Sequence, residues 1–167
     1  MHETRWLTDG EQRAWRAYLG VTALLPTALD HQLQRDSAIS HASYIVLAML
    51  SEAPGRALRM SELASRANSS QSRLSHTVAR LEERGWVRRQ RADEDRRGNV
   101  ATLTDAGWDL VVAAAPGHVA AVRQYLFDAL TPEQVGQLEE IFTTVLDVLD
   151  PAGTCPGHPA GDQPVTG

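Results

Sequence analysis

Residues 80–107 read RLEERGWVRRQRADEDRRGNVATLTDAG, and this stretch decides the fold. A helical segment ends there at Gly85, the residue type that most often closes a helix in the left-handed conformation. Trp86 begins one predicted strand, and residues 99–104 form the next. The turn between the strands, residues 93–98, is almost entirely charged. The stretch therefore predicts a helix followed directly by a β-hairpin with a charged tip.

Two short helical segments precede the hairpin. The first is predicted from Ser61 to about Ala67, and the second over about 70–84, with Ser70 as its N-cap. Leu74, Val78 and Leu81 recur at steps of four and three, which is the spacing of one helical face. Two such helices joined by a short polar turn outline a helix-turn-helix, although similar pairs are also common packing units.

The opposite face of segment 70–84 is polar and carries no acid before Glu82. Small or forked polar side chains near the start of a helix suit base reading in the major groove, where arginine binds guanine through two hydrogen bonds. The alternative is a solvated surface, but solvated helix faces usually mix both signs of charge. The predicted DNA-contacting residues of this segment are Ser70, Gln71, Ser72, Arg73, Ser75, His76 and Arg80.

A β-hairpin that follows a helix-turn-helix is a wing. Its tip is expected to reach the minor groove, whose narrow and negative surface attracts arginine. Asp95 and Arg97 are two positions apart, so on a strand edge we expect them to point to the same side and the carboxylate to orient the guanidinium. The alternative is a soluble turn whose ion pairs are screened. We predict a wing over about 86–104 that contacts DNA through Asp95, Arg96 and Arg97.

Charge is divided unevenly along the chain. The net charge is −5, yet all 16 basic residues are arginine and 11 of them lie between Arg56 and Arg97. Six acidic residues share this segment, so it carries +5 and the rest of the chain −10. A basic centre between acidic ends indicates one lobe for an anionic partner. A GC-rich genome is the alternative explanation for arginine in place of lysine.

Length and composition limit the class of protein. The 167 residues suffice for one domain or for two small lobes that share a core. No apolar stretch reaches the roughly 18 to 20 residues needed to span a bilayer, and residues 1–16 are charged throughout, unlike a signal peptide. Cys155 is the single cysteine. We expect a cytoplasmic protein without disulfides and without membrane contact.

The terminal segments have helical periodicity. A heptad-like seam suited to helix–helix packing comprises Val135, Leu138, Phe142, Val145 and Leu149. Internal core is the alternative use of these residues. We expect a mainly α fold with a small β-hairpin wing. It divides into a helical dimerisation region (8–36 and 105–149), a winged helix-turn-helix lobe (40–104) and a disordered tail (151–167).

Metal and catalytic sites are not predicted. Cys155 and His158 lack the spaced ligand set of a zinc site, and no motif joins His31, His41 and His118. Structural or solvent-facing roles are favoured for the histidines. The sequence has no nucleophile elbow, no phosphate-binding glycine loop and no paired acids in a plausible cleft. We therefore expect neither an enzyme nor a cofactor.

The run from Leu63 to Gly107 resembles the DNA-binding core of the MarR family of bacterial transcriptional regulators. RLEERGWV followed by DRRGNVATLTDAG is similar to the family's D-x-R wing signature with a downstream L-T-x-x-G, here Asp95, Arg97, Leu103, Thr104 and Gly107. The resemblance extends over residues 7–149. It implies that the protein forms a two-fold dimer and that the dimer binds an inverted-repeat operator. A repressor is expected rather than an activator. Segment 70–84 would read the major groove, and Arg97, oriented by Asp95, would enter the minor groove.

The resemblance also implies a small aromatic or phenolic ligand, bound between the dimer helices and the DNA-binding lobe, that lowers DNA affinity. Trp15, Tyr18, His41 and Tyr44 lie on segments that line such clefts in the family, and their polar-tipped rings suit a ligand pocket. The same residues also suit a core. The rival function is a winged-helix protein–protein interaction module without DNA binding, but the cationic outer face of 70–84 favours DNA.

Overall fold

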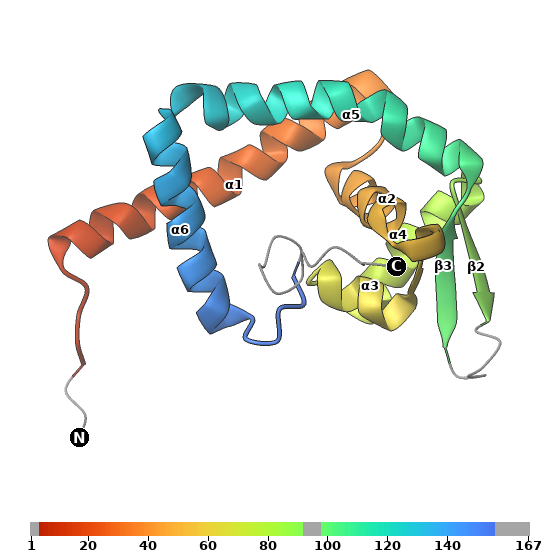
Figure 1. Ribbon diagram of the computed structural model, residues 1–167, viewed down its shortest axis with the longest axis horizontal. Coiled ribbons are helices and arrows are strands. Elements are labelled where there is room, and N and C mark those ends of the chain that lie inside the picture. Colours follow the sequence, from red (N-terminus) through yellow and green to blue (C-terminus); the bar gives the residue numbers. More distant parts are fainter. Residues whose placement is uncertain (1–3, 92–97, 156–167) are drawn as a thin grey trace.

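The computed structural model describes residues 4–91 and 98–155 (Figure 1). Its helices are α1 (Asp9–Ser37), α2 (His41–Glu52), α3 (Met60–Arg66), α4 (Gln71–Glu83), α5 (Asp105–Tyr125) and α6 (Pro132–Leu149). Its strands are β1 (Ala57–Arg59), β2 (Val87–Arg91) and β3 (Asn99–Leu103), with 3-10 turns η1 (Pro54–Arg56) and η2 (Phe127–Ala129). The predicted fold class, mainly α with a small β wing, is confirmed.

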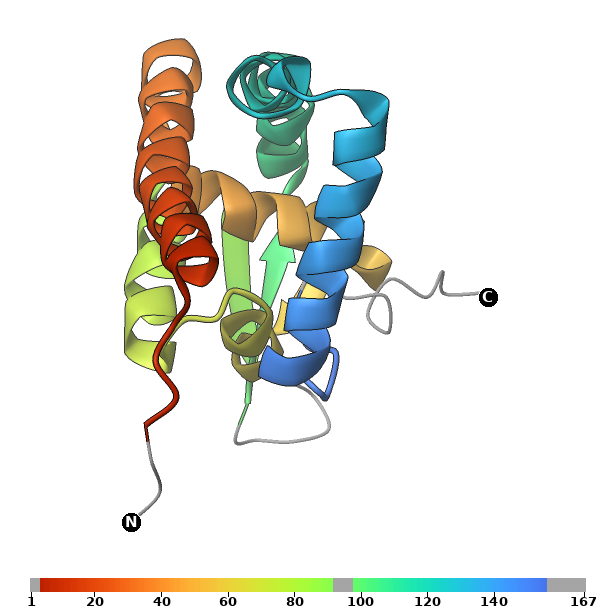
Figure 2. The same cartoon turned by 90° about the vertical axis from the view of Figure 1, so that its left-hand side faces the viewer.

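The elements form an arch (Figure 1). Helices α1 and α5 lie side by side along its top. The helix-turn-helix and the sheet lie below one end of this pair. Helix α6 descends from the other end, and Figure 2 shows it standing apart from α1. No residue of α6 is buried within the chain. The interpretation of its apolar seam as internal core is therefore wrong for a single chain.

The sheet has the order β1-β3-β2, and both pairings are antiparallel. Val87 pairs with Leu103 at the base of the hairpin, and Arg91 pairs with Asn99 toward its tip. The predicted hairpin is therefore present. Strand β1 was not predicted from the sequence, because three residues are too few to show the alternation of a strand. It pairs with β3 through Leu58 and Ala101, and both residues are buried.

The core lies mainly in the lobe. Its largest fully buried side chains there are Leu47, Leu50, Leu63, Leu74, Val78, Leu81 and Val87. The predicted inner face of segment 70–84 is thus confirmed as core. A second, smaller cluster joins α1, α2 and α5 through Leu33, Ile39, Tyr44 and Ala114. This second cluster connects the lobe to the long helices above it.

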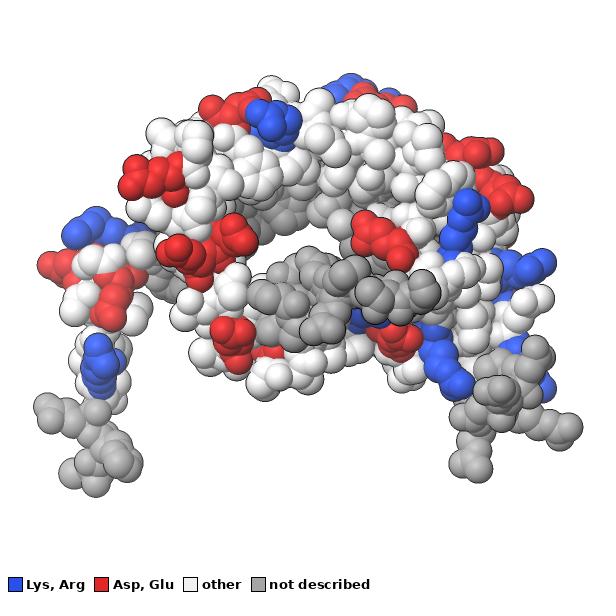
Figure 3. All heavy atoms as spheres, viewed as in Figure 1, with Lys and Arg blue, Asp and Glu red and all other residues white. Residues whose placement is uncertain are grey.

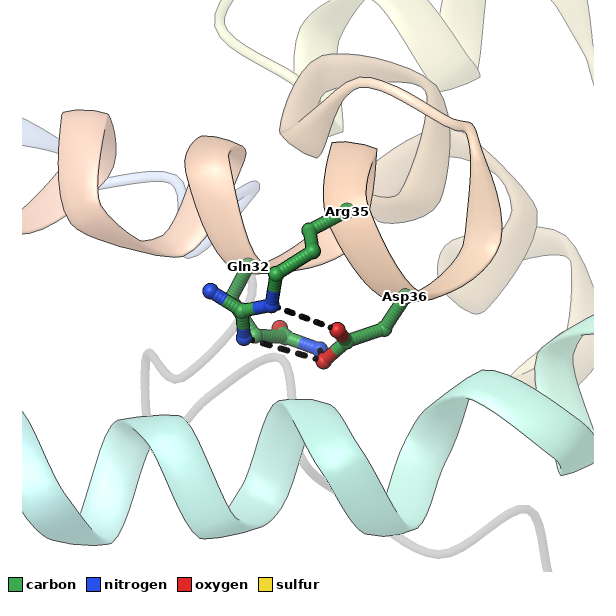
Figure 4. A network of polar contacts seen from close by, with 3 residues as sticks. All are labelled: Gln32, Arg35 and Asp36. Carbon is green, nitrogen blue, oxygen red and sulfur yellow. Dashed lines mark hydrogen bonds and ion pairs between the residues drawn. The ribbon is translucent and has the colours of Figure 1, made fainter.

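The joint between α1 and α5 contains a polar contact (Figure 4). Gln32 is 4% exposed, and its Nε2 donates to Asp36 Oδ2 at 3.0 Å. Arg35 holds the same carboxylate through Nε and Nη2, at 2.8 and 3.2 Å. A Cβ on Gly117 of α5 would lie 3.2 Å from Gln32 Nε2. The absence of a side chain at Gly117 therefore allows the two helices to approach closely here.

Hydrogen bonds join the start of α5 to the end of α4 and to the base of the wing. The Thr104 hydroxyl accepts from Gly107 N at 3.1 Å and donates to the Gly85 carbonyl at 2.7 Å. Thr104 N donates to the Trp86 carbonyl at 3.0 Å. A Cβ on Gly107 would overlap that carbonyl oxygen and lie 2.7 Å from Leu103 Cδ1. The L-T-x-x-G signature thus has a structural cause: the threonine caps α5, and the glycine lets α5 touch the wing.

One helix passes a test of length and composition for a membrane span. Among the described residues it covers Asp105–Ala129, which is α5 together with η2, and an 18-residue window of it has a mean hydropathy of 1.2. The expectation that no apolar stretch is long enough to span a bilayer is therefore not met by this test. The core helix of a soluble protein passes the same test, and α5 packs against α1 and α2 through Val111, Ala114 and Ala121. Packing therefore accounts for part of its apolar character.

Replacing Gly107 by alanine is expected to lower the free energy of unfolding by about 2–3 kcal/mol, because the new methyl group collides with backbone that cannot move aside easily. Urea unfolding followed by circular dichroism measures this change. Gly136→Ala is the matched control: Gly136 lies in α6, and beyond its chain neighbours and the backbone of its own helix the described residues place no atom within 4 Å of the new methyl group. That variant should gain about 0.5–1 kcal/mol. Equal stability of the two variants would contradict the packing of α5 on Trp86.

Candidate nucleic-acid interface

Helix α4 presents two chemically distinct faces. Leu74, Thr77, Val78 and Leu81 are buried on the inner face. The predicted contact residues Gln71, Ser72, Arg73, His76 and Arg80 are all exposed, and Ser75 is half-buried. The structure therefore places these predicted residues on one outer face of a helix whose opposite side is fixed in the core. That face is rigidly held and open to a partner.

The turn before α4 fixes where the helix begins. Asn68 adopts a left-handed φ of 43°, which asparagine tolerates better than most residues, and its N–H donates to the Ser65 carbonyl at 3.0 Å. Ser70 is the N-cap, as predicted, and its hydroxyl accepts from Arg73 N at 3.3 Å. The cap places Ser70 and Arg73 together at the exposed N-terminal end of α4.

The end of α4 leads directly into the wing. Gly85 has a φ of 74°, as predicted for a left-handed helix terminus, and Trp86 N donates to the Leu81 carbonyl at 3.0 Å. Strand β2 then begins within two residues of that terminus. The predicted contacts Asp95, Arg96 and Arg97 lie outside the described residues, so their roles remain predictions.

An ion pair joins α4 to the wing. Arg89 of β2 donates through Nε to Glu82 Oε2 at 2.8 Å, and its Nη2 lies 2.7 Å from the same oxygen. Arg89 N donates to Glu82 Oε1 at 3.0 Å. The backbone N–H of Arg89, followed by its guanidinium, holds the pKa of Glu82 below its ordinary value. Glu82 is therefore a structural clamp, and this was not foreseen from the sequence because the two residues lie on different elements.

Several arginines of the basic segment make structural contacts. Arg56 lies over the Trp108 ring at 4.0 Å, Arg84 lies over Trp86 at 5.0 Å, and Arg66 pairs with Glu62 at 2.8 Å. Figure 3 shows basic side chains gathered over the lobe on the side of the wing. Among residues 56–91 the exposed arginines are Arg59, Arg73, Arg80, Arg84, Arg88 and Arg91. The positive charge thus lies around α4 and the base of the wing.

The four predicted effector residues form two separate pairs. Trp15 and Tyr18 stack on α1 with ring centroids 5.5 Å apart, and both are about half exposed. His41 N donates to Asp30 Oδ1 at 2.7 Å, which places the second pair beside α1 near its C-terminal end. A helix rises about 1.5 Å per residue, so Trp15 lies roughly 20 Å along α1 from Asp30. Within one chain the two pairs do not meet.

A third residue, His118, lies beside His41 and Tyr44, and this contact was not predicted from the sequence. The His118 ring of α5 lies 4.5 Å from the Tyr44 ring and 5.8 Å from the His41 ring, centroid to centroid. Burial lowers the pKa of both histidines and raises the pKa of Tyr44. His118 Nδ1 is buried without a hydrogen-bond partner among residues 4–91 and 98–155. No sequence signal linked His118 to α2, because the contact forms only when α5 folds back over the lobe.

Known proteins share this architecture. The family model described as "MarR family" matches residues 39–98. The curated Transcriptional repressor MprA of Escherichia coli K12 is 28% identical over 120 residues, which cover 72% of this chain and 68% of MprA.

Two solved structures from Streptomyces coelicolor are closer in sequence. Sco3205, a MarR family transcriptional regulator solved in complex with DNA, is 52% identical, with a TM-score of 0.85, over 89% of this chain and 92% of that one. AbsC, another MarR family transcriptional regulator, is 42% identical, with a TM-score of 0.82, over 87% of this chain and 98% of that one. The winged helix-turn-helix, the basic outer face of α4 and these relatives agree. The chain belongs to the MarR family of transcriptional regulators, which are DNA-binding proteins and not enzymes.

Proposed function

We propose that this regulator is a cytoplasmic repressor that binds an inverted-repeat operator in double-stranded DNA as a homodimer. The observation that carries the DNA site is the outer face of α4, which is exposed, polar and anchored in the core by Leu74, Val78 and Leu81. The MprA relative supports repression, because it is itself a transcriptional repressor. Membership of a regulator family disfavours the rival reading, a protein-interaction module without DNA binding.

Base reading is assigned to the N-terminal half of α4. Arg73 lies in the first turn of the helix and is exposed. A helix that enters the major groove brings such a residue to the base edges, where arginine pairs with guanine through two hydrogen bonds. Arg97, with Asp95 orienting it, is assigned to the minor groove on the strength of the family signature.

The homodimer is supported by the exposed apolar surface of the long helices. Phe142, Val145 and Leu149 of the predicted seam are 44%, 47% and 74% exposed in the single chain. Leu24 of α1 and Val119 of α5 are also exposed. A second copy of the chain is the proposed cover for this surface. A two-fold dimer presents two recognition helices at sites about 34–36 Å apart, which matches an inverted repeat.

An effector is the remaining part of the proposal. The Tyr44, His41 and His118 cluster lies where α2 meets α5, so a ligand wedged there would move the lobe relative to the long helices. A small aromatic or phenolic ligand suits these rings. Because Trp15 and Tyr18 lie roughly 20 Å away along α1, one small ligand contacts only one of the two pairs in a given chain.

Wild-type protein should bind DNA from upstream of its own gene about a thousandfold more tightly than a shuffled duplex, measured by fluorescence anisotropy. Arg73→Ala should weaken binding to the upstream duplex by about ten- to hundredfold, because a base contact is lost. The ratio of the affinities for the upstream and the shuffled duplex should therefore become smaller. Arg97→Ala should weaken binding to both duplexes. Arg5→Ala, which removes the same charge from the exposed segment before α1, is the control. Unchanged upstream affinity in Arg73→Ala would remove that residue from the reading face.

Val145→Asp should convert the dimer to a monomer of 18.3 kDa, because a carboxylate is placed in the middle of the seam. Light scattering after size exclusion measures the mass. Gln137→Asp adds the same charge to α6 outside the seam and should remain a dimer. If both variants keep twice the chain mass, another surface forms the dimer.

Salicylate or another phenolic carboxylate should quench or enhance tryptophan fluorescence and lower the affinity for the upstream duplex. Tyr44→Phe and His118→Gln should reduce this response more than Tyr18→Phe does, because the first two residues lie in the α2–α5 cluster. A full titration that changes neither fluorescence nor DNA affinity would exclude this ligand class.

A further inference from the structure

Two histidines from distant parts of the chain meet where the lobe joins the long helices. His41 begins α2 and His118 lies within α5, and their ring centroids are 5.8 Å apart. Both residues are half-buried, and the Tyr44 ring lies 4.5 Å from that of His118. Tyr44 belongs to the apolar cluster that joins α1, α2 and α5. The histidine pair therefore lies at the edge of the contact that connects the lobe to the long helices.

Helix α1 brings one carboxylate to this pair. Asp30 Oδ1 accepts from the backbone N–H of His41 at 2.7 Å. Asp36 lies farther along α1, 3.8 Å from a Cβ placed on Gly117, and it is paired with Arg35 at 2.8 Å. A proton on His41 is therefore favoured by Asp30, whereas the Asp36 charge is already compensated by its neighbour.

Helices α2 and α5 supply little counter-charge. Burial, followed by the charge of Glu52, raises the pKa of Tyr44, so the phenol stays neutral in mildly acidic solution. Helix α5 has no charged residue between positions 110 and 122. His118 Nδ1 is buried, and the residues that the structure describes offer it no hydrogen-bond partner. A proton added to His118 would thus sit next to an apolar cluster and close to a second imidazole.

The neutral form of the pair is the one that suits the folded joint. Burial lowers the pKa of His41, and Asp30 opposes this shift only in part. Burial also lowers the pKa of His118, and the charge of His41 lowers it further. A histidine whose pKa is lower in the folded than in the unfolded chain stabilises the fold above its unfolded pKa of about 6.5. That stabilisation is lost as the pH falls below this value.

A protonated pair is relieved when α2 and α5 move apart. The imidazolium carries N–H donors on both ring nitrogens, and water satisfies them once it can enter between the helices. Helix α2 belongs to the lobe and α5 to the long helices, so this separation moves the lobe. In the proposed dimer, the two α4 helices must stay about 34–36 Å apart to fit adjacent turns of the operator. Movement of the lobes therefore opposes DNA binding.

We propose that the His41–His118 pair is a pH-sensitive switch, in which uptake of a proton loosens the contact of α2 with α5 and lowers the affinity for DNA. The inference rests on the proposed function and needs no small ligand. Its direction is opposite to that of simple charge effects. Acidification makes the whole chain more positive, including the exposed His76 on α4, and so strengthens its attraction to a polyanion.

The test measures affinity for the upstream duplex between pH 7.5 and pH 5.5, by anisotropy with a dye whose emission does not depend on pH. Each protein is compared with itself across this range. Wild-type affinity should fall about tenfold or more, because one proton taken up changes an equilibrium by up to about tenfold per pH unit. The double variant His41→Gln/His118→Gln should lose less than about threefold. His118→Gln alone should lie between them, since the two imidazoles titrate as a coupled pair.

His31→Gln is the matched control, because it removes an exposed imidazole from α1 and should follow the wild type. Thermal melting at pH 7.5 confirms that each variant is folded. Melting at pH 5.5 gives a readout that is independent of DNA. The melting temperature of the wild type should fall more between the two pH values than that of the double variant.

The outcomes separate this switch from the proposed function. If wild-type protein binds neither the upstream nor the shuffled duplex at pH 7.5, the proposed function fails and the switch falls with it. If wild-type protein binds but its affinity is unchanged or higher at pH 5.5, the switch is wrong while the function stands. Equal losses in the wild type and the double variant would place the responsible proton elsewhere and would also overturn the inference.

Discussion

The contact of Gly107 with the Trp86 carbonyl is the constraint on which the arrangement of the lobe depends. Around it, the Thr104 hydroxyl bonds both Gly107 N and the Gly85 carbonyl, so that the end of α4, the base of the wing and the start of α5 meet at one point. The direction of the wing relative to α4 is therefore set at this point by backbone groups and the short Thr104 side chain. The Glu82–Arg89 pair then fixes β2 against α4 one turn away.

The same junction relates the lobe to the long helices. Helix α5 starts at the wing and continues across the arch, where Gly117 allows close approach to Gln32 of α1 (Figure 4). The cluster of Leu33, Ile39, Tyr44 and Ala114 fills the angle between α1, α2 and α5. A movement between the long helices must therefore act on the lobe through α2 and α5. The unpaired Gln32 Oε1 and His118 Nδ1 both lie at this joint, within the part of the chain that the structure describes.

Local signals predicted most of the fold. Ser70 and Gly85 predicted the two ends of α4, because capping depends only on neighbouring residues. The spacing of Leu74, Val78 and Leu81 predicted its buried face. Strand β1 was not predicted, because it is three residues long and its conformation depends on pairing with β3. The Glu82–Arg89 pair and the approach of His118 to Tyr44 were also not predicted. Each depends on elements far apart in the sequence, which periodicity cannot place side by side.

The charge pattern gains a physical meaning from the fold. Helix α6 carries Glu133, Glu139, Glu140 and Asp147 and no basic residue, and it stands at the opposite side of the arch from the wing (Figure 1). At physiological salt, exposed charges are screened beyond about 8 Å, so these acids do not cancel the attraction of the arginines around α4. They repel a polyanion that comes close to α6 itself. A chain with a net charge of −5 therefore still gathers exposed arginines on one face, around α4 and the base of the wing, where Arg73, Arg80 and Arg88 lie.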